Sequence, residues 1–131
     1  MRRTIRTPAA PAPAASYEQG VAWGDLIFVA GQTAADPLQP KTVGTTIGEQ
    51  VTQALRNVEA VVEAGGGSRK TIVRCGVFLA DLADFAEMDR AFRAFFGASL
   101  PARTTVQVGL GALRVEIDAI AVGSAGGRRR G

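Results

Sequence analysis

Two stretches of strand-like sequence near the end of the chain constrain its fold most. The second stretch, 114–122, alternates strictly, which places most of its polar residues on one face of a strand and its apolar residues on the other. The first stretch, 102–108, is rich in Thr and Val, and a short turn with Gly109 and Gly111 separates the two. This arrangement predicts a β-hairpin with a loop of three to five residues.

The predicted hairpin brings two charged side chains together. Arg103 would lie roughly opposite Glu116, and the same polar face would carry Thr105, Gln107 and Asp118. One interpretation is an ion pair on a solvated face, which contributes little to stability. The other is a site in which the guanidinium binds a substrate carboxylate and Glu116 acts on a water molecule as a general base. The hairpin alone leaves both interpretations open.

Three further segments have the composition of β-strands. They are short, and glycine, aspartate or proline, which favour turns, lie near their ends; they span 16–22, 26–30 and 72–79. Gly31 follows the second segment, where a glycine indicates a strand end or a close approach of the backbone. Cys75 lies in the third segment and is expected to be a small core residue.

Two segments carry apolar residues at the spacing of an amphipathic helix. The first begins after Thr46, which with Glu49 has the form of a capping box, and it ends at a run of three glycines. The second spans 85–96 and follows Asp84, which has the same spacing to Glu87. The predicted order is therefore β-β-α-β-α-β-β, an α/β (α+β) fold with both helices on one face of the sheet. The other face is expected to meet further copies in a closed homo-oligomer.

Composition predicts one domain with two tails. Residues 1–15 are rich in Pro and Ala and predict an extended, partly mobile arm; 16–123 form the domain, and 124–131 a flexible basic tail. The tails hold six of the 15 basic residues, which leaves nine basic and twelve acidic residues between them. A nucleic-acid surface on the domain is therefore not expected.

The residue types present restrict the chemistry. There is no histidine and only one cysteine, which excludes Ser-His-Asp triads, histidine metal sites and thiolate clusters. The glycine run at 65–67 follows a helix instead of opening one, so it is no phosphate cradle. Any chemistry must therefore use Arg, Glu, Asp, Tyr, Ser or Thr side chains, backbone groups or water. No apolar run is long enough to span a membrane, no signal peptide is evident, and a lone cysteine fits a cytoplasmic location.

A series of short motifs, in order from about residue 16 to 122, resembles the Rid family of reactive intermediate deaminases, the YjgF type. The motifs are SYEQG at 16–20, FVAGQ at 28–32, NVEA at 57–60, VFLADLADF at 77–85, PAR at 101–103 and VEIDAIAV at 115–122. The resemblance implies a chorismate-mutase-like fold and a homotrimer with three clefts between subunits. It also implies hydrolysis of 2-imino acids, or their enamine tautomers, to 2-keto acids and ammonia, with no metal and no organic cofactor.

The resemblance assigns roles to five positions of this chain. Arg103 would hold the substrate carboxylate, and Glu116 would position and activate a water molecule. Tyr17 and Gly31 would line the cleft, and Thr105 would offer backbone and side-chain contacts. A protonated imine is already electrophilic, so a carboxylate anchor and an aligned water are sufficient apparatus.

The chain departs from the family pattern near these positions. Thr105 stands where the best-studied type has cysteine, Ala30 replaces a common serine, and Thr104 is unusual after the motif arginine. The turn between Arg103 and Glu116 also looks shorter. These departures leave open which imine is the physiological substrate and whether the role is housekeeping or specific to a pathway.

Two other functions remain open on the sequence. A non-catalytic module of the same fold would capture small carboxylates through Arg103 alone. A family member that cleaves RNA or inhibits translation would use the arginines at 128–130 for phosphate contacts, although the acidic domain argues against this.

Overall fold

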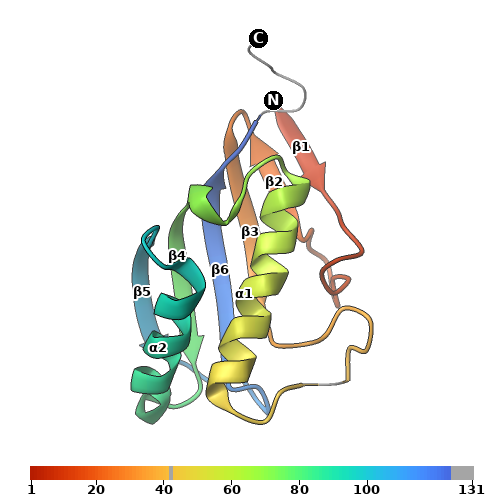
Figure 1. Cartoon of the computed structure of the whole chain (residues 1–131). Coiled ribbons are helices and arrows are strands. Elements are labelled where there is room, and N and C mark those ends of the chain that lie inside the picture. The colour runs from red at the N-terminus through yellow and green to blue at the C-terminus, as the bar shows by residue number, and fades with distance from the viewer. Residues whose placement is uncertain (42, 125–131) are drawn as a thin grey trace.

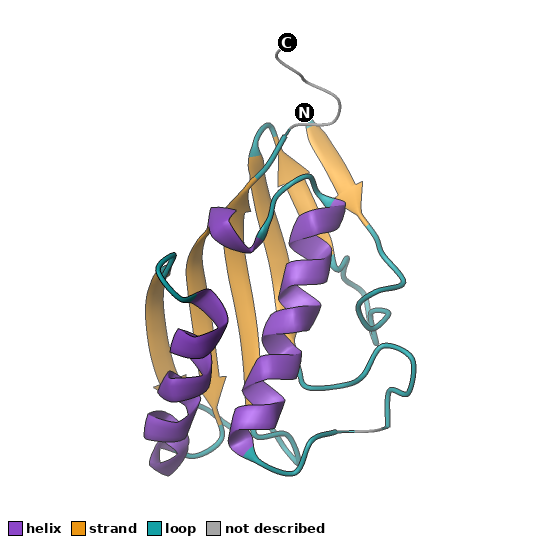
Figure 2. Cartoon of the chain, viewed as in Figure 1, coloured by secondary structure: helices purple, strands orange, loops and turns teal. Residues whose placement is uncertain are grey.

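The computed structural model describes residues 1–41 and 43–124 and consists of a six-stranded sheet with two helices on one face (Figures 1 and 2). The strands are β1 (Arg2–Ile5), β2 (Gly20–Trp23), β3 (Leu26–Gln32), β4 (Ile72–Leu79), β5 (Ala102–Gln107) and β6 (Val115–Val122). The helices are α1 (Ile47–Ala64) and α2 (Phe85–Phe96). The predicted α+β class is confirmed. The predicted basic tail, apart from Ser124, lies outside the described residues.

The predicted hairpin between β5 and β6 is wrong. The strand order is β1-β2-β3-β6-β4-β5, so β4 lies between the two strands, parallel to β5 and antiparallel to β6. The loop 108–114 passes the end of β4, where the Val108 N–H donates to the Leu79 carbonyl. Alternation specifies which residues share a face, but it does not specify which strand is the neighbour. The apolar strand β4 pairs along both of its edges, which satisfies most of its backbone groups.

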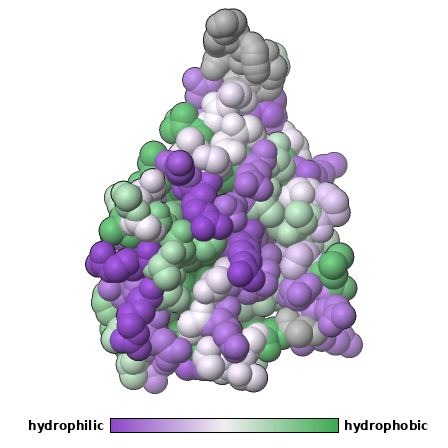
Figure 3. All heavy atoms as spheres, in the orientation of Figure 1, coloured by the Kyte–Doolittle hydropathy of each residue, from purple (hydrophilic) through white to green (hydrophobic). Residues whose placement is uncertain are grey.

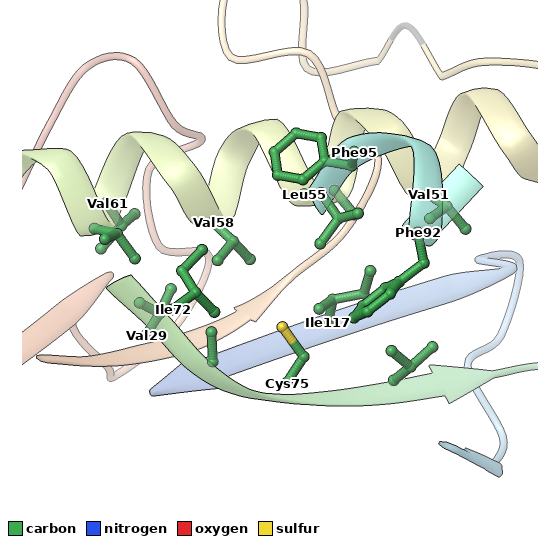
Figure 4. Close-up of a cluster of buried hydrophobic side chains, with 14 of the residues drawn as sticks. Val29, Val51, Leu55, Val58, Val61, Ile72, Cys75, Phe92, Phe95 and Ile117 are labelled. Carbon is green, nitrogen blue, oxygen red and sulfur yellow. The ribbon is translucent and has the colours of Figure 1, made fainter. Parts of the chain in front are cut away.

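The core lies between the sheet and the helices. Figure 4 shows Leu55 and Val58 of α1 directed toward the strands, with Cys75 of β4 and Ile117 of β6 directed back toward the helices. All four side chains are fully buried, as predicted for Cys75. Burial of such apolar area is the main favourable contribution to folding. The outer side of the helix layer is mostly hydrophilic (Figure 3).

The two helices begin differently. At α1 the predicted capping box is present: the Glu49 N–H donates to Thr46 Oγ1 and the Thr46 N–H donates to Glu49 Oε1, both at 3.1 Å. At α2 the prediction is wrong, because Asp84 makes no side-chain cap. Asp84 instead accepts a hydrogen bond from Arg114 at 3.0 Å. Its expected partner Glu87 accepts one from a backbone N–H of α1. Long-range partners have replaced the local cap.

The N-terminal segment is more structured than the predicted arm. Residues Arg2–Ile5 form β1, which pairs antiparallel with β2 at the edge of the sheet. Ile5 and Ala10 are each only 3% exposed and belong to the core. Four residues are too few for alternation to mark a strand, since the pattern needs a longer window. The tertiary contacts of Ile5 and Ala10 hold this segment against the domain.

The face of the sheet away from the helices retains exposed apolar side chains. Trp23, Leu26, Phe28 and Val106 are between 39% and 61% exposed. Charged residues of the central strands interrupt this surface, where Asp118 accepts a hydrogen bond from the Gly76 N–H at 2.9 Å. Neither helix in the described part of the chain is long and apolar enough to cross a membrane.

Candidate functional site

A cavity of about 600 Å³ lies between the N-terminal segment, the end of β3 and the start of β6. Three of the five residues assigned by resemblance line it: Tyr17, Gly31 and Glu116. Arg103 and Thr105 do not. Most of the remaining lining consists of alanine, proline and leucine side chains, together with a few amides. The structure therefore brings part of the predicted site together within one chain.

Glu116 is placed in the cavity by an irregularity of the sheet. The pairing of β3 with β6 shifts register between Val29 and Gln32, and Gly31 lies within this bulge. Bulges re-aim side chains beside functional sites. The Glu116 carboxylate lies so close to Gly31 that a Cβ there would overlap its carboxyl oxygen. Among the described residues, none donates a hydrogen bond to this carboxylate, so both its oxygens are available to water or a ligand.

Tyr17 joins the cavity to the N-terminal segment. Its side chain is half exposed, and its hydroxyl accepts a hydrogen bond from the Ala14 N–H at 3.2 Å. Ala14 also lines the cavity. The aromatic ring thus forms part of the wall, and the hydroxyl holds the adjacent chain segment in place.

Arg103 lies on the helix side of the sheet, which overturns the predicted shared face with Glu116. Its Nη1 donates to Asp89 of α2 at 2.9 Å, and its guanidinium lies 4.7 Å from the centre of the Phe92 ring. Glu116 projects from the other face, two strands away. Two strand spacings correspond to about 10 Å. Within one chain these two side chains do not form a common site.

The hydrogen bonding of Arg103 differs from that of a structural arginine in the same layer. Arg69 also stacks on a phenylalanine of α2, but its Nε and both Nη atoms donate to Glu59 and to the Phe95 carbonyl. For Arg103 the described residues accept from Nη1 only, although its side chain is just 19% exposed. A largely buried guanidinium with unused donors is suited to bind a carboxylate.

Thr105 follows two residues later on the same side of β5. Its Oγ1 is buried and has no hydrogen-bond partner in the described part of the chain. Buried hydroxyl groups are nearly always paired, so an unpaired one indicates a missing partner. Arg103 and Thr105 therefore form a second group of unsatisfied donors, separate from the cavity.

The described residues offer neither a reactive thiol nor a cluster of metal ligands. Burial, and next the nearby charge of Asp118, raise the pKa of Cys75 to about 12, which keeps its thiol protonated. Within residues 1–41 and 43–124, no three cysteine or acidic side chains gather as a metal site would require. Sequence reasoning missed Asp89, because its contact with Arg103 depends on how β5, the element that follows α2, packs under that helix, which no local spacing indicates.

Comparison with known proteins gives consistent matches along nearly the whole chain. The family model described as Endoribonuclease L-PSP matches residues 7–123. A RutC family protein of Pyrococcus horikoshii is 37% identical over 123 residues, covering 92% of this chain and 98% of the relative. The 2-iminobutanoate/2-iminopropanoate deaminase of Escherichia coli K12 is 42% identical over 129 residues, covering 93% and 98%. The crystal structure of E. coli TdcF with bound serine superposes with a TM-score of 0.87 at 35% identity, covering 93% and 99%.

Proposed function

Because this chain belongs to the Rid/YjgF family, whose model is described as Endoribonuclease L-PSP, we propose that it hydrolyses 2-imino acids to 2-keto acids and ammonia. Relatives about 40% identical carry the name 2-iminobutanoate/2-iminopropanoate deaminase, which supports imine deamination at the level of the family. In the reaction, the C=N bond of the protonated imine is replaced by the C=O bond of the keto acid, and water supplies the oxygen.

One observation supports the assignment of residues most strongly. Among the described residues, no cationic side chain lines the cavity that holds Glu116, although an imino acid brings a carboxylate that needs one. Arg103 and Thr105 carry unused donors outside the cavity, on the edge strand β5, with the Thr105 hydroxyl buried within one chain. We propose that a second copy supplies these donors to the cavity, so that each site lies between two subunits of a homotrimer. The bound serine of the similar TdcF structure also carries a carboxylate.

The chemistry follows from these positions. The Arg103 guanidinium of one subunit binds the substrate carboxylate through two parallel hydrogen bonds. This places the imine carbon beside Glu116 of the other subunit, which removes a proton from water as the oxygen attacks the carbon. The resulting carbinolamine collapses with the electrons of the C–N bond passing to nitrogen. Glu116 gives its proton to the nitrogen as it departs and takes up the hydroxyl proton as the C=O bond forms. That second proton passes to ammonia, which leaves as ammonium, so no redox step and no cofactor enter the balance.

A coupled assay tests the proposal. An amino-acid oxidase generates the imino acid in place, and keto-acid formation is timed against spontaneous hydrolysis. We expect Glu116→Gln to lower kcat about a hundredfold or more, because it removes the base. We expect Arg103→Ala to lower kcat/KM about a hundredfold, the value of two hydrogen bonds to a charged group. Arg90→Ala is the matched control, since Arg90 is an exposed arginine on α2.

The assay also separates the alternative function. If wild-type protein fails to accelerate hydrolysis of small, branched and aromatic imino acids, the deaminase proposal is wrong. Binding of keto acids that requires Arg103 but not Glu116 would then identify a non-catalytic carboxylate-binding module.

A further inference from the structure

Two loop segments form the walls of the cavity opposite the sheet. One is the N-terminal segment, which contributes Pro11, Ala12 and Ala14; the other follows β3 and contributes Thr33 and Ala35. Both are loops without regular secondary structure, on the same side of α1 in Figure 2. Loops of this kind are mobile unless their backbone groups are tied down. The shape of the cavity therefore depends on what fixes these segments.

A buried glutamine fixes the first wall. Gln19 is 3% exposed, and its Oε1 accepts a hydrogen bond from the Thr7 N–H at 2.8 Å. Its Nε2 donates to the carbonyls of Thr7, Ala10 and Pro11 at 2.9 to 3.1 Å. One side chain thus holds a five-residue stretch of backbone, and the last of these residues lines the cavity.

A buried asparagine fixes the second wall in the same way. Asn57 of α1 is 1% exposed, and its Nδ2 donates to the carbonyls of Thr33 and Ala35, both at 2.9 Å. Its Oδ1 accepts from Gln53 Nε2 at 3.0 Å, which fixes the orientation of the amide. Both carbonyls belong to residues that line the cavity. Two buried amides, from different elements, therefore hold the two walls.

The surface that these walls present is mostly apolar and carries no charge, although the polar residues Gln19, Gln32 and Thr33 also line the cavity. Pro11, Ala12, Ala14, Ala30, Ala35 and Leu113 contribute apolar atoms, and Glu116 is the only charged residue that lines the cavity in the described part of the chain. An acidic substrate side chain would meet the Glu116 carboxylate without a cation of its own, because the proposed Arg103 of the second subunit is already bound to the substrate carboxylate. An apolar side chain would gain contact area, which strengthens binding about fourfold for each methylene that is fully buried.

We infer that Gln19 and Asn57 are positioning residues that set side-chain specificity: they hold an apolar wall that selects substrates with apolar side chains and rejects acidic ones. This inference rests on the proposed function for the identity of the substrate as a 2-imino or 2-keto acid. It concerns the side-chain end of the substrate, whereas Arg103 and Glu116 act on the carboxylate and the imine. Release of either wall exposes the cavity to water and removes the contacts that favour long apolar side chains.

Calorimetric titration with keto acids tests the inference independently of turnover. The probes are pyruvate, 4-methyl-2-oxopentanoate and 2-oxoglutarate, and we expect the branched acid to bind wild type about tenfold more tightly than pyruvate, with 2-oxoglutarate weakest. In Gln19→Ala and Asn57→Ala the preference for the branched acid should fall to about threefold or less, while pyruvate affinity changes less than about twofold. An equal loss for both acids would indicate a purely structural role and overturn the inference.

Matched variants separate specificity from folding. Gln50→Ala removes another buried amide that donates to a loop carbonyl, that of Gly44 at 2.8 Å, but neither residue lines the cavity. The Gln50→Ala variant should prefer the branched acid over pyruvate by the same factor as wild type. Ala12→Asp places a charge on the exposed surface of the wall without removing a buried bond, and Ala9→Asp is its control outside the cavity. If the amide variants do not fold, Ala12→Asp provides the test. An unchanged preference for the branched acid over pyruvate in Ala12→Asp overturns the inference.

The outcome is distinguishable from failure of the proposed function. Activity in wild type with a preference that no wall variant alters would overturn the inference and leave the deaminase proposal intact. A wall-dependent preference in a protein without activity would support the inference and overturn the chemistry. If wild type shows neither activity nor binding of any of the three acids, both are overturned.

Discussion

Gly31 and Glu116 illustrate how a single residue without a side chain can fix the position of a functional group. The carboxylate occupies the space where a Cβ at position 31 would lie. The backbone of Gly31 does not have a positive φ, so the requirement for glycine here is steric and comes from its neighbour. Position 31 is thus coupled directly to the proposed general base.

The first prediction concerns this contact. Gly31→Ala should displace the Glu116 carboxylate and lower kcat/KM about tenfold or more, because small misplacements of catalytic groups are costly. Gly109→Ala is the matched control, since a Cβ at Gly109 meets nothing within 4 Å. Keto-acid formation in the coupled assay measures both variants. Full activity in Gly31→Ala would show that the position of Glu116 does not limit the reaction.

A second prediction concerns Asp89, which we propose as a positioning residue for Arg103. The Asp89 carboxylate accepts from Nη1 at 2.9 Å and the Phe92 ring supports the guanidinium. Asp89→Ala should raise KM about three- to tenfold with little change in kcat, because Arg103 loses its orientation before substrate binds. Asp89→Asn retains an acceptor oxygen and should restore most of the affinity. Equal defects in the two variants would contradict a role through orientation.

A third prediction follows from the buried thiol of Cys75. Its pKa is raised from 9.0 to about 12, so the folded state keeps a proton that the unfolded state loses above pH 9. Stability from this group is complete below pH 9 and is lost as pH rises toward 12. At pH 10 the loss is about 1 kcal/mol. Urea unfolding of wild type and Cys75→Ala at pH 8 and pH 10 measures the difference. Parallel pH dependence in both proteins would contradict the assignment.

At the scale of secondary-structure elements, the capping box of α1 provides a fourth prediction. Thr46→Ala removes the acceptor for the Glu49 N–H and should lower the free energy of unfolding by about 1 kcal/mol, measured in urea. The pKa of Glu49 is lowered by hydrogen bonds from the backbone N–H groups of Thr46 and Thr45, so this part of the cap weakens as pH falls through that lowered value. An unchanged midpoint would show that tertiary contacts alone hold the helix start.

The elements that sequence predicted well are those with a strong local signal. The span of α2 at 85–96 and the strand at 72–79 match the structure, as does the start of α1 after Thr46. Hydrophobic periodicity and capping motifs depend only on residues that are close in sequence, and such local information is sufficient to place these elements. The pairing of β5 with β4, the strand β1 and the displaced cap of α2 all depend on residues distant in sequence.

The site shows the same contrast between local signals and contacts that depend on the tertiary structure. Tyr17, Gly31 and Glu116 meet in one cavity, as the resemblance implied, whereas Arg103 lies on the other side of the sheet. Alternation alone predicted the wrong face for Arg103 because the assumed neighbour was wrong. Gln19 stood in a recognised motif, but its role depends on carbonyls of a segment whose path no pattern indicated.

At the scale of the whole molecule, two features lack a partner within one chain: the apolar face of the sheet and the unused donors on β5. The open face of the sheet exposes Trp23, Leu26 and Phe28, and the edge strand β5 carries Arg103 and the buried hydroxyl of Thr105, both with unused donors. Apolar patches of this kind commonly mark interfaces. A closed homotrimer, as we propose, would cover the apolar face and bring Arg103 of each subunit to the cavity of the next.

Subunit complementation tests this shared site most directly. Arg103→Ala and Glu116→Ala should each keep only about one hundredth of wild-type activity or less in the coupled assay. When the two variants are co-expressed, random assembly gives about one quarter of the sites an intact Arg103 from one subunit and an intact Glu116 from the other, so about one quarter of wild-type activity should return. Native mass spectrometry confirms that mixed oligomers form. Mixed oligomers that remain as inactive as either variant alone would contradict a site built from two subunits.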